Sequence, residues 1–238
     1  EAVLEGQTAP PQYFPKNAAL NKMGYNSLVG ILEKGLTALD PDSFEEAANR
    51  MEALVLDTRR ETDFVKGFIP NSIFIGLDGN FVTWVGILIL DLKQTILLLA
   101  DEGKEEEVIT RLSRVGYDNT IGYLKGGINN WIAAGKEIDS IKSVSSLELA
   151  KTMNKQRINL LDVRRKTEYD NARVLGAQLT TVDHINDYIN DLQKQTEYFM
   201  YCEGGYRSVM AASILKSRGF NCLVNVEGGF NEIQLTNV

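Results

Sequence analysis

The chain contains one unit twice, and this duplication limits its possible folds more than any other feature. The first copy has Leu54–Arg59 (LVLDTR) and the second has Asn159–Arg164 (NLLDVR), each a short apolar run that ends in Asp-x-Arg. Later, Leu124–Gly127 (LKGG) matches Val226–Gly229 (VEGG). The copies lie about 100 residues apart, which is the size of a domain rather than of a solenoid repeat. We therefore predict two related domains in tandem.

Short apolar runs alternate with amphipathic stretches in each copy, which is typical of an α/β fold. In the second copy the predicted strands are 158–163, 177–179, 197–201 and 222–226, and the predicted helices are 166–171, 185–195 and 208–216. This alternation predicts a mostly parallel sheet with helices on both faces in each domain. In such sheets a functional site lies beyond the carboxyl ends of the strands.

The domain boundaries follow from the extent of the two copies. Residues 1–35 belong to neither copy and form an N-terminal segment. The first domain spans 36–139 and the second spans 140–238, with the junction near Lys136–Ser143.

A cysteine opens a glycine-rich turn after the predicted strand 197–201. The turn reads CEGGYRS, and a helix-like run follows it. Backbone amides at such a turn and helix start favour negative charge, so we expect a lowered thiol pKa and a nucleophilic thiolate. An arginine offers an anion a planar fork of donors. The catalytic candidates are Cys202 and Arg207, and the substrate-binding candidates are Glu203, Gly204, Gly205, Tyr206 and Ser208.

This turn resembles the active-site loop of rhodaneses, which are sulfurtransferases. Their pattern of Cys, four residues, Arg and a small hydroxyl residue is met by Cys202, Arg207 and Ser208. The order Asp-x-Arg, Glu-Tyr, Gly-Ala, Cys loop, Gly-Phe and Gly-Gly also resembles a rhodanese domain. Where rhodaneses often have histidine before Gly-Ala, this chain has Arg173. That histidine does not carry sulfur in the family, so the expected activity is unaffected.

The resemblance implies a sulfur carrier. Sulfane sulfur moves from thiosulfate or a thiol persulfide to Cys202, and an acceptor such as cyanide or a thiol removes it. Glu203 places negative charge beside Cys202, which should weaken thiosulfate binding relative to a loop with a basic residue there, so thiol persulfides are plausible donors beside thiosulfate. We expect Asp162 and Arg164 to form a structural pair at a strand end rather than to act in catalysis.

The first copy lacks the residues for this chemistry. Ala100 occupies the cysteine position and Glu105 the arginine position, within the acidic stretch Asp101–Glu107 (DEGKEEE). Carboxylates suit a helix start, but they repel an anionic substrate. We expect the first domain to be non-catalytic and to serve packing, partner docking or positioning of the second.

Composition excludes several partners. The formal net charge of −7 argues against nucleic acid and against an anionic membrane surface. Two cysteines make no disulfide framework, and Cys222 is expected to be an inert core residue. With His184 as the one histidine, we expect no metal and no cofactor. A reactive thiol suits a reducing cytoplasm. The sequence does not set the oligomeric state, so a homo-oligomer stays open.

A second resemblance concerns the N-terminal segment. Residues Pro10–Asn21 resemble the segment that follows the metallo-β-lactamase-fold domain in persulfide dioxygenase–rhodanese fusions, and Thr83–Gly86 and Asp101–Gly103 also look like those fusions. This implies that a metal-binding domain preceded Glu1 in the full protein.

Two other functional classes remain as alternatives. A non-enzymatic interaction module fits the acidic first copy, although the intact loop of the second argues against it. A cysteine phosphatase or arsenate reductase needs a larger oxyanion cradle, and dual-specificity phosphatases have one more residue between Cys and Arg.

Overall fold

The computed structural model describes residues 27–236, which form two compact units. The first unit contains the described residues up to Arg60 together with Ile75–Glu137, and the second contains Glu61–Phe74 together with the described residues from Ile138 onward. The resemblance at Pro10–Asn21 lies outside the described residues.

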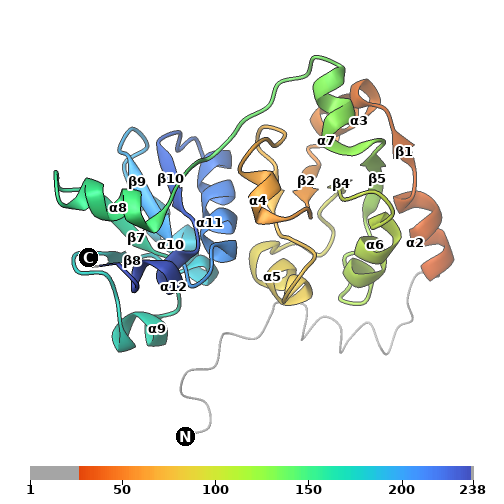
Figure 1. Cartoon of the computed structure of the whole chain (residues 1–238). Coiled ribbons are helices and arrows are strands. Elements are labelled where there is room, and N and C mark those ends of the chain that lie inside the picture. Colours follow the sequence, from red (N-terminus) through yellow and green to blue (C-terminus); the bar gives the residue numbers. More distant parts are fainter. Residues whose placement is uncertain (1–26, 237–238) are drawn as a thin grey trace, which may run out of the picture. The chain divides into compact units, whose positions relative to one another are not determined.

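The first sheet has the strand order β1-β5-β4-β2-β3 (Figure 1). Its pairs β1–β5, β4–β5 and β2–β4 are parallel. Its strands are β1 Ala38–Leu39, β2 Leu54–Asp57, β3 Ile73–Phe74, β4 Ile96–Leu99 and β5 Thr120–Leu124. The helices of this half of the chain are α2 Leu28–Gly35, α3 Pro41–Arg50, α4 Glu61–Phe64, α5 Phe81–Leu88, α6 Glu105–Ser113 and α7 Gly127–Ala133.

The second sheet repeats this topology with the order β6-β10-β9-β7-β8, and all its pairs are parallel. Its strands are β6 Lys142–Val144, β7 Asn159–Asp162, β8 Gln178–Leu179, β9 Tyr198–Tyr201 and β10 Leu223–Val226. The helices are α8 Ser146–Met153, α9 Lys166–Asn171, α10 Ile185–Tyr188, α11 Tyr206–Ser217 and α12 Gly229–Ile233, with single turns η1 Val182–His184 and η2 Ile189–Asp191. The predicted tandem α/β fold is confirmed.

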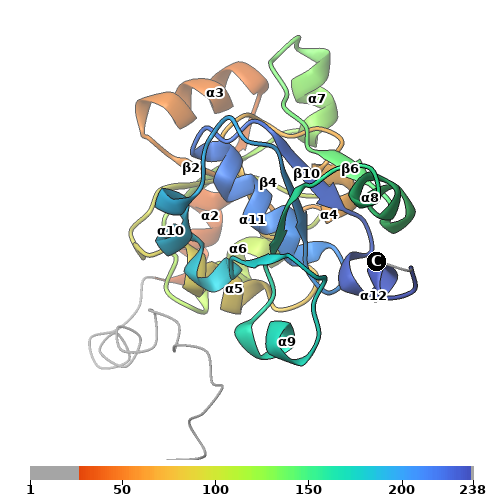
Figure 2. The same ribbon diagram turned by 90° about the vertical axis from the view of Figure 1, so that its left-hand side faces the viewer.

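The core of the second unit lies on both faces of its sheet. On one face α8 and α12 lie side by side (Figure 2), and Leu149 and Ile233 from these helices pack with Phe199 and Val224 from the strands. On the other face runs α11, whose residues 208–215 are all buried. A helix buried on every side needs a cover over its outer surface.

The segment Glu61–Phe74 helps to cover α11 within the second unit. The rings of Phe64 and Phe68 stack with centroids 4.2 Å apart, and Phe74 lies 5.2 Å from Phe64. The Phe74 N–H donates to Ser213 Oγ on α11 at 3.0 Å. All three phenylalanines are fully buried. A stretch from the first sequence copy therefore belongs to the core around α11.

Several elements differ from the sequence-based expectation. The predicted helix 185–195 is broken into α10 and η2, and Leu192 then becomes extended. Strand β6 lies at the end of the stretch that we assigned to the junction. Helix α2 comes from the predicted N-terminal segment, and it packs against α6. Cys222 is half-buried just before β10 rather than enclosed in the core.

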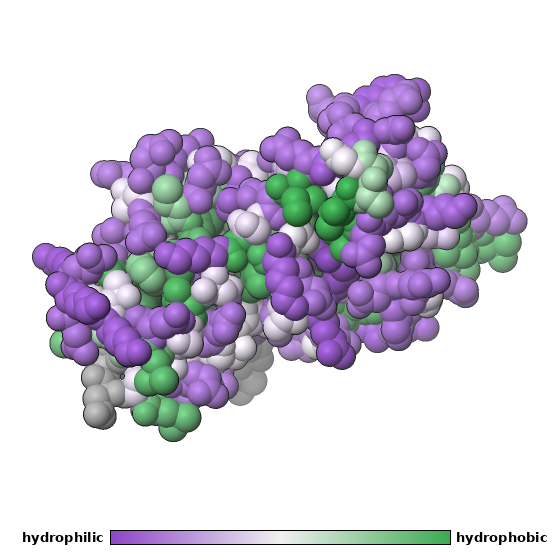
Figure 3. Space-filling view, turned by 45° about the horizontal axis from the view of Figure 1, so that its top comes forward, coloured by the Kyte–Doolittle hydropathy of each residue, from purple (hydrophilic) through white to green (hydrophobic). Residues whose placement is uncertain are grey.

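The face in Figure 3 is mainly hydrophilic with separate apolar patches. In residues 27–236 we find no helix that is both long and apolar enough to span a membrane.

Candidate active site

Cys202 lies where β9 ends, at the carboxyl edge of the second sheet. Its side chain is buried, and the Gly205 N–H donates to Sγ with a distance of 3.1 Å. Gly205 has φ of +106° and is the N-cap of α11, so a glycine is needed to turn its amide toward the sulfur. The amide and the start of a 12-residue helix both favour negative charge on Sγ.

A second glycine turn holds the backbone of this loop in place through two hydrogen bonds. The Phe230 N–H donates to the Cys202 carbonyl at 2.7 Å, and the Asn231 N–H donates to the Glu203 carbonyl at 3.0 Å. A Cβ on Gly229 would lie 2.4 Å from the Cys202 oxygen, so only glycine fits there. The Gly-Gly repeat was visible in the sequence, but its role as a support for the loop was not.

Arg207, the second residue of α11, is paired with Glu168 of α9. The Arg207 Nη1 and Nη2 atoms donate to the two Glu168 oxygens at 2.7 Å each. Burial works against the guanidinium charge, but Glu168 and the nearby Cys202 and Glu203 charges raise the pKa of Arg207. Burial likewise opposes the Glu168 charge, but Arg207 and the Arg165 amide hold the pKa of Glu168 below its ordinary value. Glu168 was not among our site candidates.

Glu203 forms a second ion pair beside the loop. Its Oε2 accepts from Arg164 Nη1 at 3.1 Å, and its side chain is 43% exposed. Arg164 is itself buried, donates to both Asp162 oxygens and lies 4.0 Å above the Phe230 ring. Asp162 and Arg164 thus form the ion pair that we expected at the end of a strand. Burial opposes the Arg164 charge, but Asp162 and Glu203 outweigh it and raise the pKa of Arg164.

The remaining candidate residues have mainly architectural contacts. Ser208 Oγ is fully buried and lies 2.9 Å from the Gly205 carbonyl and 2.7 Å from Asn225 Oδ1, so it ties the loop to β10. Tyr206 meets the Phe74 ring edge-on at 5.5 Å. Gly204 is exposed at the outer side of the loop.

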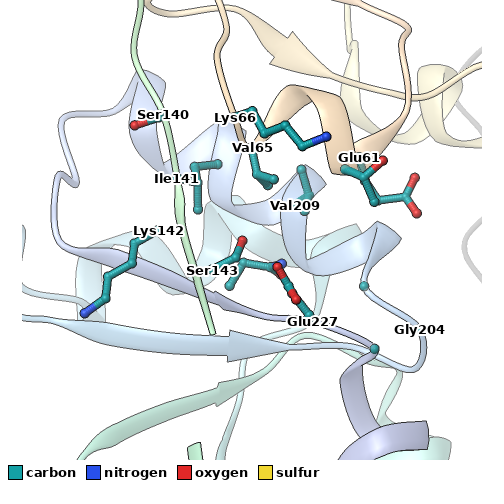
Figure 4. A pocket seen from close by; sticks show the side chains of 14 residues that line it. Glu61, Val65, Lys66, Ser140, Ile141, Lys142, Ser143, Gly204, Val209 and Glu227 are labelled. Atoms are coloured by element: carbon teal, nitrogen blue, oxygen red, sulfur yellow. The ribbon is translucent and has the colours of Figure 1, made fainter. Parts of the chain in front are cut away.

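A pocket of about 720 Å³ adjoins the loop within the second unit (Figure 4). Gly204 and Gly205 line it where it meets the loop, and Cys202 is not among its lining residues. The charged side chains around it are Glu61, Lys66, Lys142 and Glu227. Pockets of 300–1,000 Å³ are the usual size for organic ligands of drug-like mass. The space thus suits a substrate larger than an inorganic anion.

The corresponding position of the first unit has no thiol. Ala100 follows β4 as Cys202 follows β9, and α6 then begins with Glu105, Glu106 and Glu107. Glu107 pairs with Lys104 and Arg111, so its carboxylate belongs to surface ion pairs. Within residues 27–236, no three His, Cys, Asp or Glu side chains are grouped to hold a metal ion.

Several known proteins are similar to parts of this chain. The putative sulfur carrier protein YrkF of Bacillus subtilis (strain 168) is 29% identical over 111 residues, which cover 44% of this chain and 60% of that protein. The thiosulfate sulfurtransferase GlpE of Coxiella burnetii (strain RSA 331 / Henzerling II) is 27% identical over 89 residues, covering 37% and 83%. The structure of a rhodanese-like domain protein from Staphylococcus aureus is 31% identical with a TM-score of 0.38, covering 39% and 91%.

These matches concern parts of proteins. The chain spans about three fifths of the length of YrkF and of the uncharacterized protein YqhL from the same strain. The family model described as rhodanese-like domain matches residues 40–134 and again residues 145–236. Because these two stretches make up more than half of the sequence, this chain belongs to the rhodanese-like domain family and carries two such domains in tandem.

Proposed function

We propose that this protein is a sulfurtransferase in which Cys202 carries the transferred sulfur atom. The observation that carries this proposal is the loop after β9, where the Gly205 amide is 3.1 Å from Cys202 Sγ at the start of α11. Relatives named as a sulfur carrier protein and as a thiosulfate sulfurtransferase support the same class of reaction.

The reaction has two balanced steps. The Cys202 thiolate attacks the outer sulfur of the donor, the donor's S–S bond breaks, and its electron pair leaves with sulfite or with a thiolate. The product is a Cys202 persulfide anion, which the Gly205 amide and the helix start stabilise. An acceptor such as cyanide or a thiolate then attacks the outer sulfur and releases the Cys202 thiolate.

The donor that we favour is a thiol persulfide, with thiosulfate as the alternative. Glu203 adds a half-exposed carboxylate beside the loop, which disfavours a dianion. The pocket next to Gly204 and Gly205 offers room for the organic part of a persulfide. Two acidic and two basic side chains line this pocket, namely Glu61, Glu227, Lys66 and Lys142. They fit a donor with charges of both signs.

The first domain serves as a non-catalytic partner of the second in this proposal, because Ala100 offers no nucleophile. A free thiol at the loop fits a reducing compartment, so a cytoplasmic location goes with it. The upstream metal-binding domain and a homo-oligomer stay predictions.

Assays on one sample distinguish the three functional classes. Purified protein is assayed for sulfur transfer from thiosulfate and from a thiol persulfide to cyanide, and for hydrolysis of an aryl phosphate. We expect transfer with at least one sulfur donor and no phosphate release. Phosphate release without sulfur transfer would favour the phosphatase, and inactivity in both assays would favour the interaction module.

A further inference from the structure

The arginine of the Cys202 loop is occupied by a carboxylate. Both terminal nitrogens of Arg207 donate to Glu168 at 2.7 Å, and the Arg207 side chain is only 17% exposed. A bidentate pair of this kind is the arrangement with which arginine would otherwise bind an anionic substrate. Glu168 therefore holds the position that a donor's oxygen atoms would need at Arg207.

Glu168 is fixed independently of Arg207. It is the third residue of α9, and its Oε2 accepts from the Arg165 N–H at 3.0 Å, where it closes the start of the helix. This second anchor keeps the carboxylate beside the loop, so that the Arg207 side chain does not have to hold it there. The pair is thus built into the junction of α9 and α11.

The charged side chains that are hydrogen-bonded to one another around the loop carry a net negative charge. Three carboxylates, Asp162, Glu168 and Glu203, face two guanidiniums, Arg164 and Arg207, which leaves one excess negative charge before the Cys202 thiolate is counted. Each added negative charge on a donor is repelled by this excess, and the repulsion is largest for a dianion.

We infer that Glu168 is a specificity-determining residue of the sulfurtransferase reaction, which disfavours dianionic sulfur donors by neutralising Arg207. This inference rests on the proposed function. Glu168 acts through Arg207 and does not take part in bond making, so it is a positioning residue.

Two small donors isolate the effect of charge. Thiosulfate is a dianion that releases sulfite, and methanethiosulfonate is a monoanion that releases methanesulfinate. With both, the Cys202 thiolate takes the outer sulfur, the S–S bond breaks, and its electron pair stays on the leaving sulfur. The selectivity is the ratio of kcat/KM for thiosulfate to that for methanethiosulfonate.

The test variant is Glu168→Gln, which keeps the shape of the side chain and removes its charge. We expect the selectivity ratio to rise about tenfold, the size of one unit of charge acting through a partly screened protein interior, mostly through a lower KM for thiosulfate. Glu168→Asp keeps the charge but shortens the reach, so its ratio should stay within about twofold of the wild type even if both rates fall.

The matched control is Asp170→Asn. Asp170 lies on the same helix, pairs with Lys166 at the surface and is 53% exposed, so its loss removes the same charge outside the loop. Its selectivity ratio should be unchanged within about twofold, because solvent screens exposed charges.

Two results would overturn the inference. An unchanged ratio in Glu168→Gln, which includes an equal loss with both donors, would make the Glu168 carboxylate only a support for the loop. A Glu168→Gln protein that fails to fold by circular dichroism would make it a structural requirement. Failure of the proposed function is seen separately, since the wild-type protein would then take up sulfur from neither donor.

Discussion

Replacing Gly229 with alanine should push the Cys202 loop out of position. The new Cβ would lie 2.4 Å from the Cys202 carbonyl oxygen and 2.8 Å from the Glu203 carbonyl, and all of these are backbone atoms. Ordinary contacts begin at 3.4 Å, so the loop or the glycine turn has to move by roughly 1 Å. A misplacement of this size costs an active site up to about 100-fold in rate.

The loss of stability has two sources. Gly229 has φ of +57°, and an alanine in the left-handed region costs about 1–2 kcal/mol. Overpacking against fixed backbone adds about 1–3 kcal/mol. We expect the free energy of unfolding of the second unit to fall by about 2–5 kcal/mol in Gly229→Ala.

The first copy supplies a matched control. Gly127 occupies the corresponding position with φ of +59°, but a Cβ there meets its nearest atom, the Ala100 oxygen, at 3.8 Å. Gly127→Ala should therefore cost only the conformational term of about 1–2 kcal/mol. Urea unfolding followed by circular dichroism reports both units. Tryptophan emission reports the first unit, because Trp84 and Trp131 both lie in it.

The rate of sulfur loading on Cys202 completes the comparison. Gly229→Ala should load sulfur 10- to 100-fold more slowly, and Gly127→Ala at the wild-type rate. Equal destabilisation by the two substitutions, together with an unchanged loading rate in Gly229→Ala, would show that Gly229 does not support the Cys202 loop.

Three further results are expected. Arg207→Ala should slow sulfur loading from every anionic donor, and Arg207→Lys should restore it only in part in steady-state assays, because an ammonium lacks the fork that engages Glu168. Because the pKa of Glu168 is lowered in the folded protein, the ionised Glu168 side chain contributes fully to the free energy of unfolding above a pH of about 4.5, and this contribution is lost as the pH falls further. Measurements of the free energy of unfolding at decreasing pH should show this loss in the wild type and not in Glu168→Gln. Residues 36–139 expressed alone should take up no sulfur by mass spectrometry, because Ala100 replaces the nucleophile. Residues 140–238 expressed alone should load sulfur but unfold at a lower urea concentration, because they lack the segment 61–74 that covers α11.

The strands and the loop of the second domain were predictable because their signals are local. The predicted strands 158–163, 197–201 and 222–226 each differ from β7, β9 and β10 by one residue at most at either end. Short buried strands, glycine turns and a helix opening after Cys202 all show in neighbouring residues. The duplication added a second reading of the same signals.

The pairing of Arg207 with Glu168 could not be predicted from the sequence. The two residues are 39 positions apart, and several other carboxylates lie near the loop in the sequence. Which carboxylate reaches the guanidinium depends on how α9 and α11 are placed at the sheet edge. We consequently assigned Arg207 to the substrate alone and omitted Glu168 from the site.

The contribution of Glu61–Phe74 to the second unit was also not predictable. The two copies look self-contained in the sequence, and the phenylalanines of this segment fit the core of either one. The hydrogen bond from the Phe74 N–H to Ser213 and the contact between the Phe74 and Tyr206 rings place the segment against α11. For the same reason Ser208, a candidate for contact with substrate, is buried against Asn225, because the rotation of α11 decides where its first turn points.

The most direct test of Cys202 as the sulfur carrier is the mass of the protein after exposure to a sulfur donor. Cys202 and the half-buried Cys222 are the only cysteines, so each acts as the internal control of the other. We predict one added sulfur atom that maps to the peptide of Cys202, is absent in Cys202→Ser and is retained in Cys222→Ser. Sulfur on Cys222, or undiminished transfer in Cys202→Ser, would show that Cys202 is not the carrier.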